Sequence, residues 1–566
     1  MKRAHAMPFG AEIGVGGVHF RLWAPAQRRV ILELDGSLHE MNSLSGGWHE
    51  LSVAGAQAGA RYRYVLEDGL AVPDPASRAN PDDVHGSSRV VDPGAYAWRD
   101  AAWRGRPWHE AVVYELHVGT FTPQGSFAAA RGRLGGLAEL GITAIELMPV
   151  ADFPGRRNWG YDGVLPYAPD ACYGTPDELK ALVDAAHRHG LMVLLDAVYN
   201  HFGPEGNYLH AYCPDFFDPG RHTPWGAAID FGRRGVRDFF VHNALYWVEE
   251  YGFDGLRLDA VHAIRDDSSE HIVCEIGRAL REGPGRERQV HLVLENDANE
   301  AHLLGACARA QWNDDLHHVL HVLATGEADG YYADYAQAPL EQLGRALAEG
   351  FVYQGEPSPF RDGAPRGEPS AQLPPTAFVS FDQTHDQVGN RAFGERLDAL
   401  AGRARVDAAL ACVLLAPQVP MLFMGEEFAA ATPFQFFCDF GPELAAAVTR
   451  GRRAEFERFA SFGRDIPDPN DEATFLRSKL DWSAQDEARR ALVRKLLALR
   501  RRHLVPRLAE ARSGSFSIRD GSLAVSWPLG GGARWNMSLR QDGGAPGPAG
   551  EAIYDSDALR VALEAG

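Results

Sequence analysis

Hydrophobic and polar positions follow two different patterns along the chain. Residues 1–97 contain runs that alternate apolar and polar positions, such as VHFRLWAP and RRVILELDG, separated by Gly and Pro. Alternation with a period of two is typical of strands that bury one face. We therefore predict an N-terminal β-sandwich over 1–97, of the immunoglobulin-like, carbohydrate-binding type. The Pro- and Asp-rich stretch 73–100 is interpreted as a linker.

After residue 112 the pattern changes to short apolar runs that alternate with amphipathic segments. There are eight runs: VVYELHVGTF, ITAIELMPV, LMVLLDAVYNH, FDGLRLDA, VHLVLEND, AQWNDDLHH, TAFVSFDQTHD and MLFMGEE. Alternating strands and helices predict an α/β fold, here a (β/α)8 TIM barrel over 98–505. A doubly wound open sheet is the alternative. Polar and acidic residues end many different runs, which favours the barrel, because barrel active sites form at the C-terminal ends of the strands.

Local signals refine this division. The segment TPDELKALVDAAHRHG begins with Thr175, Pro176 and Glu178, which predicts a capped helix. A stretch rich in Gly, Pro and aromatic residues, 200–235, is predicted to be a long functional loop insertion. Residues 506–566 alternate again and predict a small C-terminal β domain.

Composition restricts the partners and the compartment. The chain has 566 residues and a formal net charge of −20 at pH 7, which argues against nucleic acid or an anionic membrane as a partner. The six cysteines form no CxxC pair, so we expect free thiols in a reducing compartment. The N-terminus contains no apolar signal region and no apolar run is long enough to span a membrane. These features predict a soluble, cytoplasmic protein.

Three carboxylates end separate strand-like runs: Asp259 in GLRLDAVH, Glu295 in VLENDAN and Asp386 in SFDQTHDQVGN. In a barrel these strand ends meet at one mouth. Two carboxylates that flank a glycosidic bond carry out its hydrolysis, one ionised and the other protonated. Arg257 shares a strand face with Asp259, so we predict that it keeps Asp259 ionised. A purely structural ion pair is the alternative.

Four motifs resemble those of the α-amylase family of glycoside hydrolases, in the family's order. They are DAVYNH (196–201), GLRLDAVH (255–262), LENDAN (294–299) and THDQ (384–387). One departure is Thr384, where the family usually carries Asn before His-Asp.

The resemblance implies a retaining double displacement. Because this chemistry needs only carboxylates and the sequence shows no convincing metal cluster, we predict that no metal and no cofactor take part. Asp259 matches the nucleophile, Glu295 the general acid/base and Asp386 the third carboxylate, which positions the sugar. The residues expected to contact the substrate are Tyr161, His201, Arg257, His262, Asn313, Asp314, His317, His385 and Gln387.

Longer stretches, among them YELHVGTFTPQGSF, NHFGPEGNYL and MGEEFAAATPFQFFCDF, resemble one branch of this family. Members of that branch cleave malto-oligosyltrehalose at the α-1,4 bond next to its terminal trehalose unit and release trehalose. Glycogen-branching and debranching enzymes of the same family remain the alternative. A non-catalytic amylase-like binding protein is disfavoured, since the three carboxylates are intact.

Two aromatic clusters have more than one interpretation. His317, His318 and His321 suggest a metal only weakly, because no suitable ligand beyond Asp314 and Asp315 lies near them. A sugar contact is preferred, with packing as the alternative. Phe216, Phe217 and Trp225 in the long loop either line sugar subsites or form a packed core of the loop.

Overall fold

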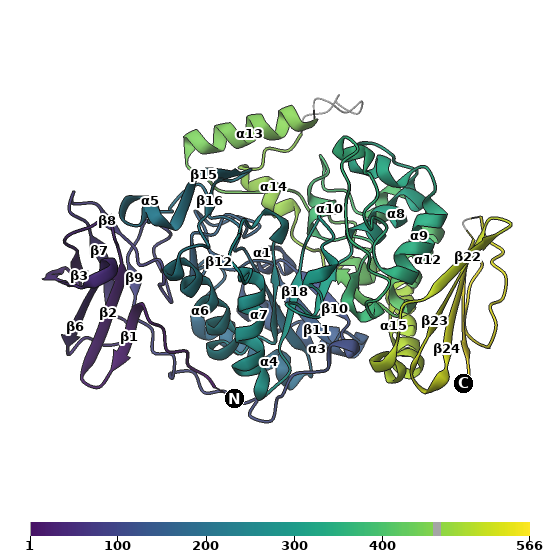
Figure 1. The fold of residues 1–566 in the computed structure, drawn as a ribbon, viewed down its shortest axis with the longest axis horizontal. Helices are drawn as coiled ribbons and strands as arrows, with labels where there is room; N and C mark the ends of the chain where they lie inside the picture. The colour runs from purple at the N-terminus through teal and green to yellow at the C-terminus, as the bar shows by residue number, and fades with distance from the viewer. Residues whose placement is uncertain (1, 457–465, 541) are drawn as a thin grey trace.

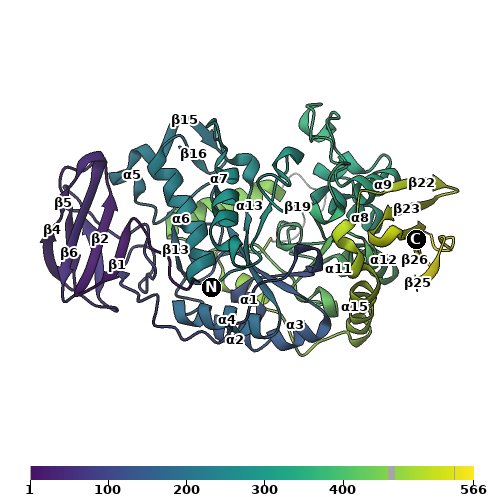
Figure 2. The ribbon, with the colours of Figure 1, turned by 60° about the horizontal axis from the view of Figure 1, so that its bottom comes forward.

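The computed structural model describes residues 2–456, 466–540 and 542–566, and its centre is a closed barrel of eight parallel strands (Figures 1 and 2). The strands are β10 (Val113–Leu116), β11 (Ala144–Leu147), β14 (Met192–Ala197), β17 (Gly255–Leu258), β18 (His291–Leu294), β19 (Ala310–Trp312), β20 (Phe378–Ser380) and β21 (Val419–Phe423). Each predicted run contains or overlaps one of them. The predicted (β/α)8 barrel is therefore confirmed, and the open sheet is excluded because β21 pairs with β10.

Helices surround the barrel and shield both the strands and each other from water. They include α4 (Pro176–Arg188), α6 (Arg234–Glu250), α7 (Ile272–Glu282), α8 (Asp314–Thr325), α9 (Pro339–Glu349), α12 (Arg403–Leu415) and α15 (Glu487–Leu499). The predicted cap of α4 is present: Thr175 accepts from the Glu178 N–H, and the Glu178 carboxylate accepts from the Thr175 N–H. No helix in the described ranges is long and apolar enough to cross a membrane.

Two antiparallel sheets precede the barrel and lie at the left of Figure 1. One is formed by β1 (Gly10–Gly14), β2 (Gly17–Trp23), β6 (Trp48–Ala54) and β5 (Asn42–Ser43), and the other by β4 (Ser37–Glu40), β3 (Ile31–Leu34), β7 (Arg61–Val65) and β8 (Ala71–Val72), with β9 (Ser88–Arg89) beside β7. Sheets at both ends of the chain were predicted and are confirmed. The exact domain limits stay a prediction.

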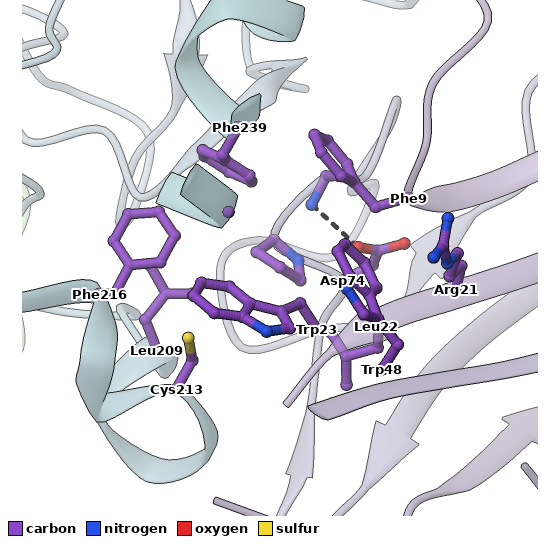
Figure 3. Close-up of a pocket in the computed structure, with 13 residues that line it drawn as sticks. Phe9, Arg21, Leu22, Trp23, Trp48, Asp74, Leu209, Cys213, Phe216 and Phe239 are labelled. Carbon is purple, nitrogen blue, oxygen red and sulfur yellow. Dashed lines mark hydrogen bonds between the residues drawn. The ribbon is translucent and has the colours of Figure 1, made fainter. Parts of the chain in front are cut away.

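The stretch 73–100 is not the open linker that its composition suggested. Arg78 is buried, and its guanidinium bonds the Glu250 carboxylate of α6 at 3.2 Å and the Ala11 carbonyl at 2.9 Å. Close by, Trp23 packs on Gly235 at the start of α6 and borders a small apolar pocket (Figure 3). Buried charge and aromatic packing thus fix the N-terminal sheets to the barrel.

A five-stranded sheet, β22 (Ser515–Arg519), β23 (Ser522–Pro528), β24 (Arg534–Arg540), β26 (Leu559–Glu564) and β25 (Glu551–Asp555), ends the chain. The indole N–H groups of Trp527 and Trp535 donate to the carbonyls of Leu347 and Leu415 at 3.0 and 2.8 Å. These bonds attach the sheet to the ends of α9 and α12, on the side of the barrel opposite the N-terminal sheets (Figure 1).

The expectation that all six cysteines are free is wrong for two of them. Cys274 of α7 and Cys307, 33 residues apart in the sequence, form a disulfide. Gly277 lets the Cys307 backbone approach α7, because a Cβ at this glycine would lie only 2.0 Å from the Cys307 carbonyl oxygen. Sequence spacing does not reveal such a contact. The prediction of a reducing compartment, and with it of the cytoplasm, loses the support of the free thiols.

Removal of this disulfide is expected to destabilise the protein. Cys274→Ser together with Cys307→Ser should lower the free energy of unfolding by about 2–4 kcal/mol, since the crosslink restricts the unfolded chain. Thermal unfolding of the non-reduced proteins measures this loss, with Cys172→Ser, at a free thiol, as the control. Denatured, non-reduced wild type should titrate four thiols with Ellman's reagent. Six reactive thiols would contradict the assignment.

Candidate active site

One arginine holds three carboxylates at the ends of neighbouring barrel strands. The Arg257 Nη1 donates to both oxygens of Asp196 at 2.7 Å and to Asp259 at 2.8 Å. Its Nη2 lies 3.1 Å from the Glu295 carboxylate. The guanidinium is buried and packs 4.2 Å from the ring centroid of Trp312 at the end of β19. The barrel therefore gathers the acids of β14, β17 and β18 around one positive charge.

The pKa values of this cluster are raised although all three acids bind Arg257. Burial raises the pKa of Asp259, and the charge of Arg257 offsets this effect only in part. Burial also raises the pKa of Asp196 and of Glu295, which bind the same guanidinium. Arg257 alone therefore does not hold Asp259 at an ordinary pKa. A carboxylic acid with a raised pKa suits Glu295 as a proton donor.

A strained residue connects the two central acids. Ala260 follows Asp259 and adopts a left-handed conformation with φ 40° and ψ 50°. This conformation costs a residue with a side chain about 1–3 kcal/mol. It directs the Ala260 N–H at the Glu295 carboxylate, 2.7 Å away. The backbone that ends β17 thus fixes the position of the acid that ends β18.

Asp386 lies at the exposed start of the short helix α10 (His385–Gly389). Thr384 caps this helix: its hydroxyl accepts from the Asp386 N–H at 3.2 Å, and the Gln387 side chain accepts from the Thr384 N–H at 3.1 Å. The departure from the family's Asn therefore preserves a capped helix. Asn390 donates to the Asp386 carboxylate at 2.6 Å.

Aromatic rings line the other side of the cluster. The Tyr161 hydroxyl donates to Asp196 at 2.6 Å, and its ring stacks on His385 with centroids 5.1 Å apart. His201 donates to the Tyr161 carbonyl at 3.0 Å, and burial lowers its pKa to about 4, so it is uncharged at neutral pH. Trp225 is 47% exposed and stacks on His201 at 4.6 Å.

The aromatic residues of the long loop divide between the two predicted roles, a packed core of the loop and a surface near the site. It folds into the hairpin β15 (Phe217–Thr223) and β16 (Gly226–Ile229). Phe216 and Phe217 are buried and pack on Phe202. They form the core of the loop, while Trp225 alone extends the aromatic surface toward the site.

Comparison with known proteins shows the family to which the chain belongs. Residues 115–215 match the model of the alpha amylase catalytic domain. A malto-oligosyltrehalose trehalohydrolase of Deinococcus radiodurans is 46% identical over 501 residues, which cover 86% of this chain and 82% of that protein. The chain belongs to the malto-oligosyltrehalose trehalohydrolase family, within the α-amylases. A trehalohydrolase of Rhizobium sp. is 43% identical over 511 residues, with 86% of this chain and 85% of that protein covered.

A solved structure agrees with the placement among the α-amylases. The crystal structure of a Salmonella typhimurium protein, described there as a candidate alpha amylase, is 48% identical. It superimposes with a TM-score of 0.95 and covers 99% of this chain and 100% of its own.

Only part of the NDDLHH segment faces the acids. Asn313 caps α8 and donates to the Gly350 carbonyl at 2.8 Å, and His317 donates to the Asp382 carbonyl at 2.7 Å. Burial lowers the pKa of His317 to about 3. The side chains of Asn313 and His317 thus bond to other parts of the protein, as the packing alternative to a sugar contact expects.

Asp314 and His262 lie beside the acids. Burial, reinforced by the charge of Glu295, raises the pKa of Asp314. The His262 ring accepts from the Asp297 N–H at 3.3 Å and lies close to the Glu295 carboxyl. In the described ranges no group of three or more His, Cys, Asp or Glu side chains is arranged to hold a metal.

The sequence interpretation missed two acids of this trehalohydrolase site, Asp196 and Glu115. Asp196 ends the third strand in DAVYNH, so its strand-end position was a usable signal. Glu115 lies inside the run VVYELHVGTF, where nothing marks it in the sequence. In the structure it is 1% exposed and bonds His385.

A cleft of about 1190 Å³ opens next to Asp386. Gln387, Asn390, Arg391, Tyr331 and Phe360 line it. Helix α13 (Pro442–Phe456), which crosses the top of Figure 1, contributes its last turns. From the sequence we predict that the segments FAAATPFQFF (428–437) and NDDLHH (313–318) contact the trehalose end. The described lining of this cleft includes no residue of either segment.

Proposed function

We propose that the protein is a retaining glycoside hydrolase that acts on malto-oligosyltrehalose. It cleaves the α-1,4 bond next to the terminal trehalose unit and releases trehalose. The observation that carries this proposal is that Asp259 and Glu295 both bind the Arg257 guanidinium, in a chain that is 46% identical to a trehalohydrolase. Two carboxyl groups held on the same guanidinium are placed to act on one glycosidic bond from two sides.

In the first step a carboxylate oxygen of Asp259 attacks C1 of the glucose unit that precedes trehalose. Glu295 gives its proton to the glycosidic oxygen, the C1–O bond breaks, and trehalose leaves. In the second step the Glu295 carboxylate takes a proton from water, which attacks C1 and releases Asp259. Each step inverts C1, so the product retains the α configuration.

Other residues position the sugar in this proposal. The exposed Asp386 accepts hydroxyl hydrogen bonds, and the Tyr161 ring supports the apolar face of the reacting glucose. Asp314, His262 and Gln387 remain proposed contacts. We assign no polar contact to Asn313, His317 or His201, whose side-chain polar atoms bond the protein. The cleft beside Asp386 is the proposed position of the trehalose unit.

The anomer of the product tests the mechanism. Hydrolysis of maltotriosyltrehalose should give trehalose and maltotriose, and the new reducing end should appear first as the α-anomer, because two inversions restore the configuration. Proton NMR during the first minutes, before mutarotation, resolves the two anomers. An initial β-anomer would contradict retention, and α-1,6 branches formed from amylose would favour a branching enzyme instead.

A further inference from the structure

His385 is bound by a single buried acid on its inner side. The Nδ1–H of His385 donates to one oxygen of Glu115 at 2.5 Å, and the backbone N–H of His385 donates to the other oxygen at 3.0 Å. Glu115 belongs to β10, the first strand of the barrel, whereas His385 begins α10, far later in the sequence. Both side chains are almost completely buried, at 1% and 3% exposure.

The surroundings leave the His385 ring one orientation. Trp159 packs against it edge to face at 5.4 Å, and Tyr161 stacks on it at 5.1 Å. In the part of the chain that the structure describes, the Nε2 of His385 makes no hydrogen bond. This nitrogen is therefore the polar atom of the ring that remains for a ligand, in the residue that directly precedes Asp386.

We propose that Glu115 is a positioning residue, which fixes His385 with Nδ1–H turned inward and Nε2 presented to the sugar held by Asp386. The two bonds to one carboxylate set the rotation of the ring and the position of its backbone together. The inference rests on the proposed glycoside hydrolysis. It adds a role for a residue that touches no reacting atom.

The charges around His385 give this arrangement a pH dependence. The charged groups that act on it are Glu115, Asp386, Arg257, Asp196 and Asp259. Burial by itself would lower the pKa of His385, but the charge and hydrogen bond of Glu115 outweigh it, and the pKa is raised. The imidazolium therefore persists to higher pH, with Nε2–H as a charged donor, and is lost as the pH rises through the raised pKa.

Another glutamate of the same layer provides a matched control. Glu146 pairs in register with Glu115 across β10 and β11 and is 2% exposed. Burial raises its pKa well above the usual range, which favours the neutral form. It makes no hydrogen bond to His385 within the described residues. Glu146→Gln thus changes the same layer and leaves the bonds between Glu115 and His385 in place.

The test compares the pH profiles of wild type, Glu115→Gln and Glu146→Gln on whichever α-1,4-glucan the wild type cleaves. Glu115→Gln keeps the size of the side chain but removes its charge. The kcat/KM should fall about 10- to 100-fold, as expected for loss of a charged hydrogen bond, and the alkaline limb should move to lower pH. Glu146→Gln should leave the position of this limb unchanged.

NMR of histidine-labelled protein supplies a readout that needs no substrate. The His385 resonance, assigned by its absence from His385→Gln, should titrate at lower pH in Glu115→Gln than in wild type. Wild-type titration and a wild-type alkaline limb in Glu115→Gln would overturn the inference while leaving the proposed function intact. If Glu115→Gln does not fold, Glu115→Asp should keep the raised titration of His385, and its loss in that charged variant would equally overturn the inference.

Discussion

Asp259→Asn is expected to lower kcat by about three to five orders of magnitude without unfolding the protein. The amide has the same shape, so its oxygen still accepts from Arg257, which bonds this side chain at 2.8 Å. It does not form the glycosyl ester, because an amide oxygen is a poor nucleophile. Glu295→Gln should lower kcat by a similar factor, since the amide keeps its bond to the Ala260 N–H but donates no acidic proton.

The two variants should differ on an activated substrate. A maltosyl fluoride has a leaving group that needs no proton, so Glu295→Gln should recover a fast first-turnover burst of fluoride, after which the missing base slows the second step, while Asp259→Asn should give no burst. Fluoride release and thermal unfolding are measured on the same purified samples. A near-normal kcat in either folded variant, or recovery of Asp259→Asn by the fluoride, would refute the assignment of the two acids.

The barrel and two of its three expected acids were predictable from the sequence for a physical reason. Strands buried on both faces are continuously apolar, so the first polar residue after each run marks a strand end at the mouth. This rule finds Asp259 and Glu295, and it also finds Asp196. Asp386 lies four residues beyond Asp382, the first acid after its run, and is identified by the resemblance of THDQ to the family motif. It does not find Glu115, which lies within a strand and faces the interior of the barrel.

Contacts among three or more groups were not predictable. The strand period places Arg257 beside Asp259, but it does not show that Asp196 and Glu295 bind the same guanidinium. Helical periodicity likewise does not tell which residue of NDDLHH faces the site. The disulfide depends on a close approach at Gly277, which is a property of tertiary packing.

Strong preference for a trehalose end is the second large effect that we expect. The α,α-1,1 bond removes the reducing end and turns the last ring, so trehalose presents a different set of hydroxyls from maltose. Polar groups in the cleft that are placed for the hydroxyls of trehalose, for which Gln387 is a candidate, would be left unpaired by the wrong sugar. Each unpaired group costs about 1–3 kcal/mol, and two or three of them give a discrimination of about 10²–10⁴ in kcat/KM.

The ratio of kcat/KM for maltotriosyltrehalose to that for maltopentaose tests the proposed function most directly. The two substrates have five glucose units each and differ only at the last linkage. Each is given separately to the purified protein, and the products are resolved by chromatography. We predict trehalose and maltotriose from the first substrate, with a ratio of about 10²–10⁴. Equal values for the two substrates would contradict a site built for trehalose.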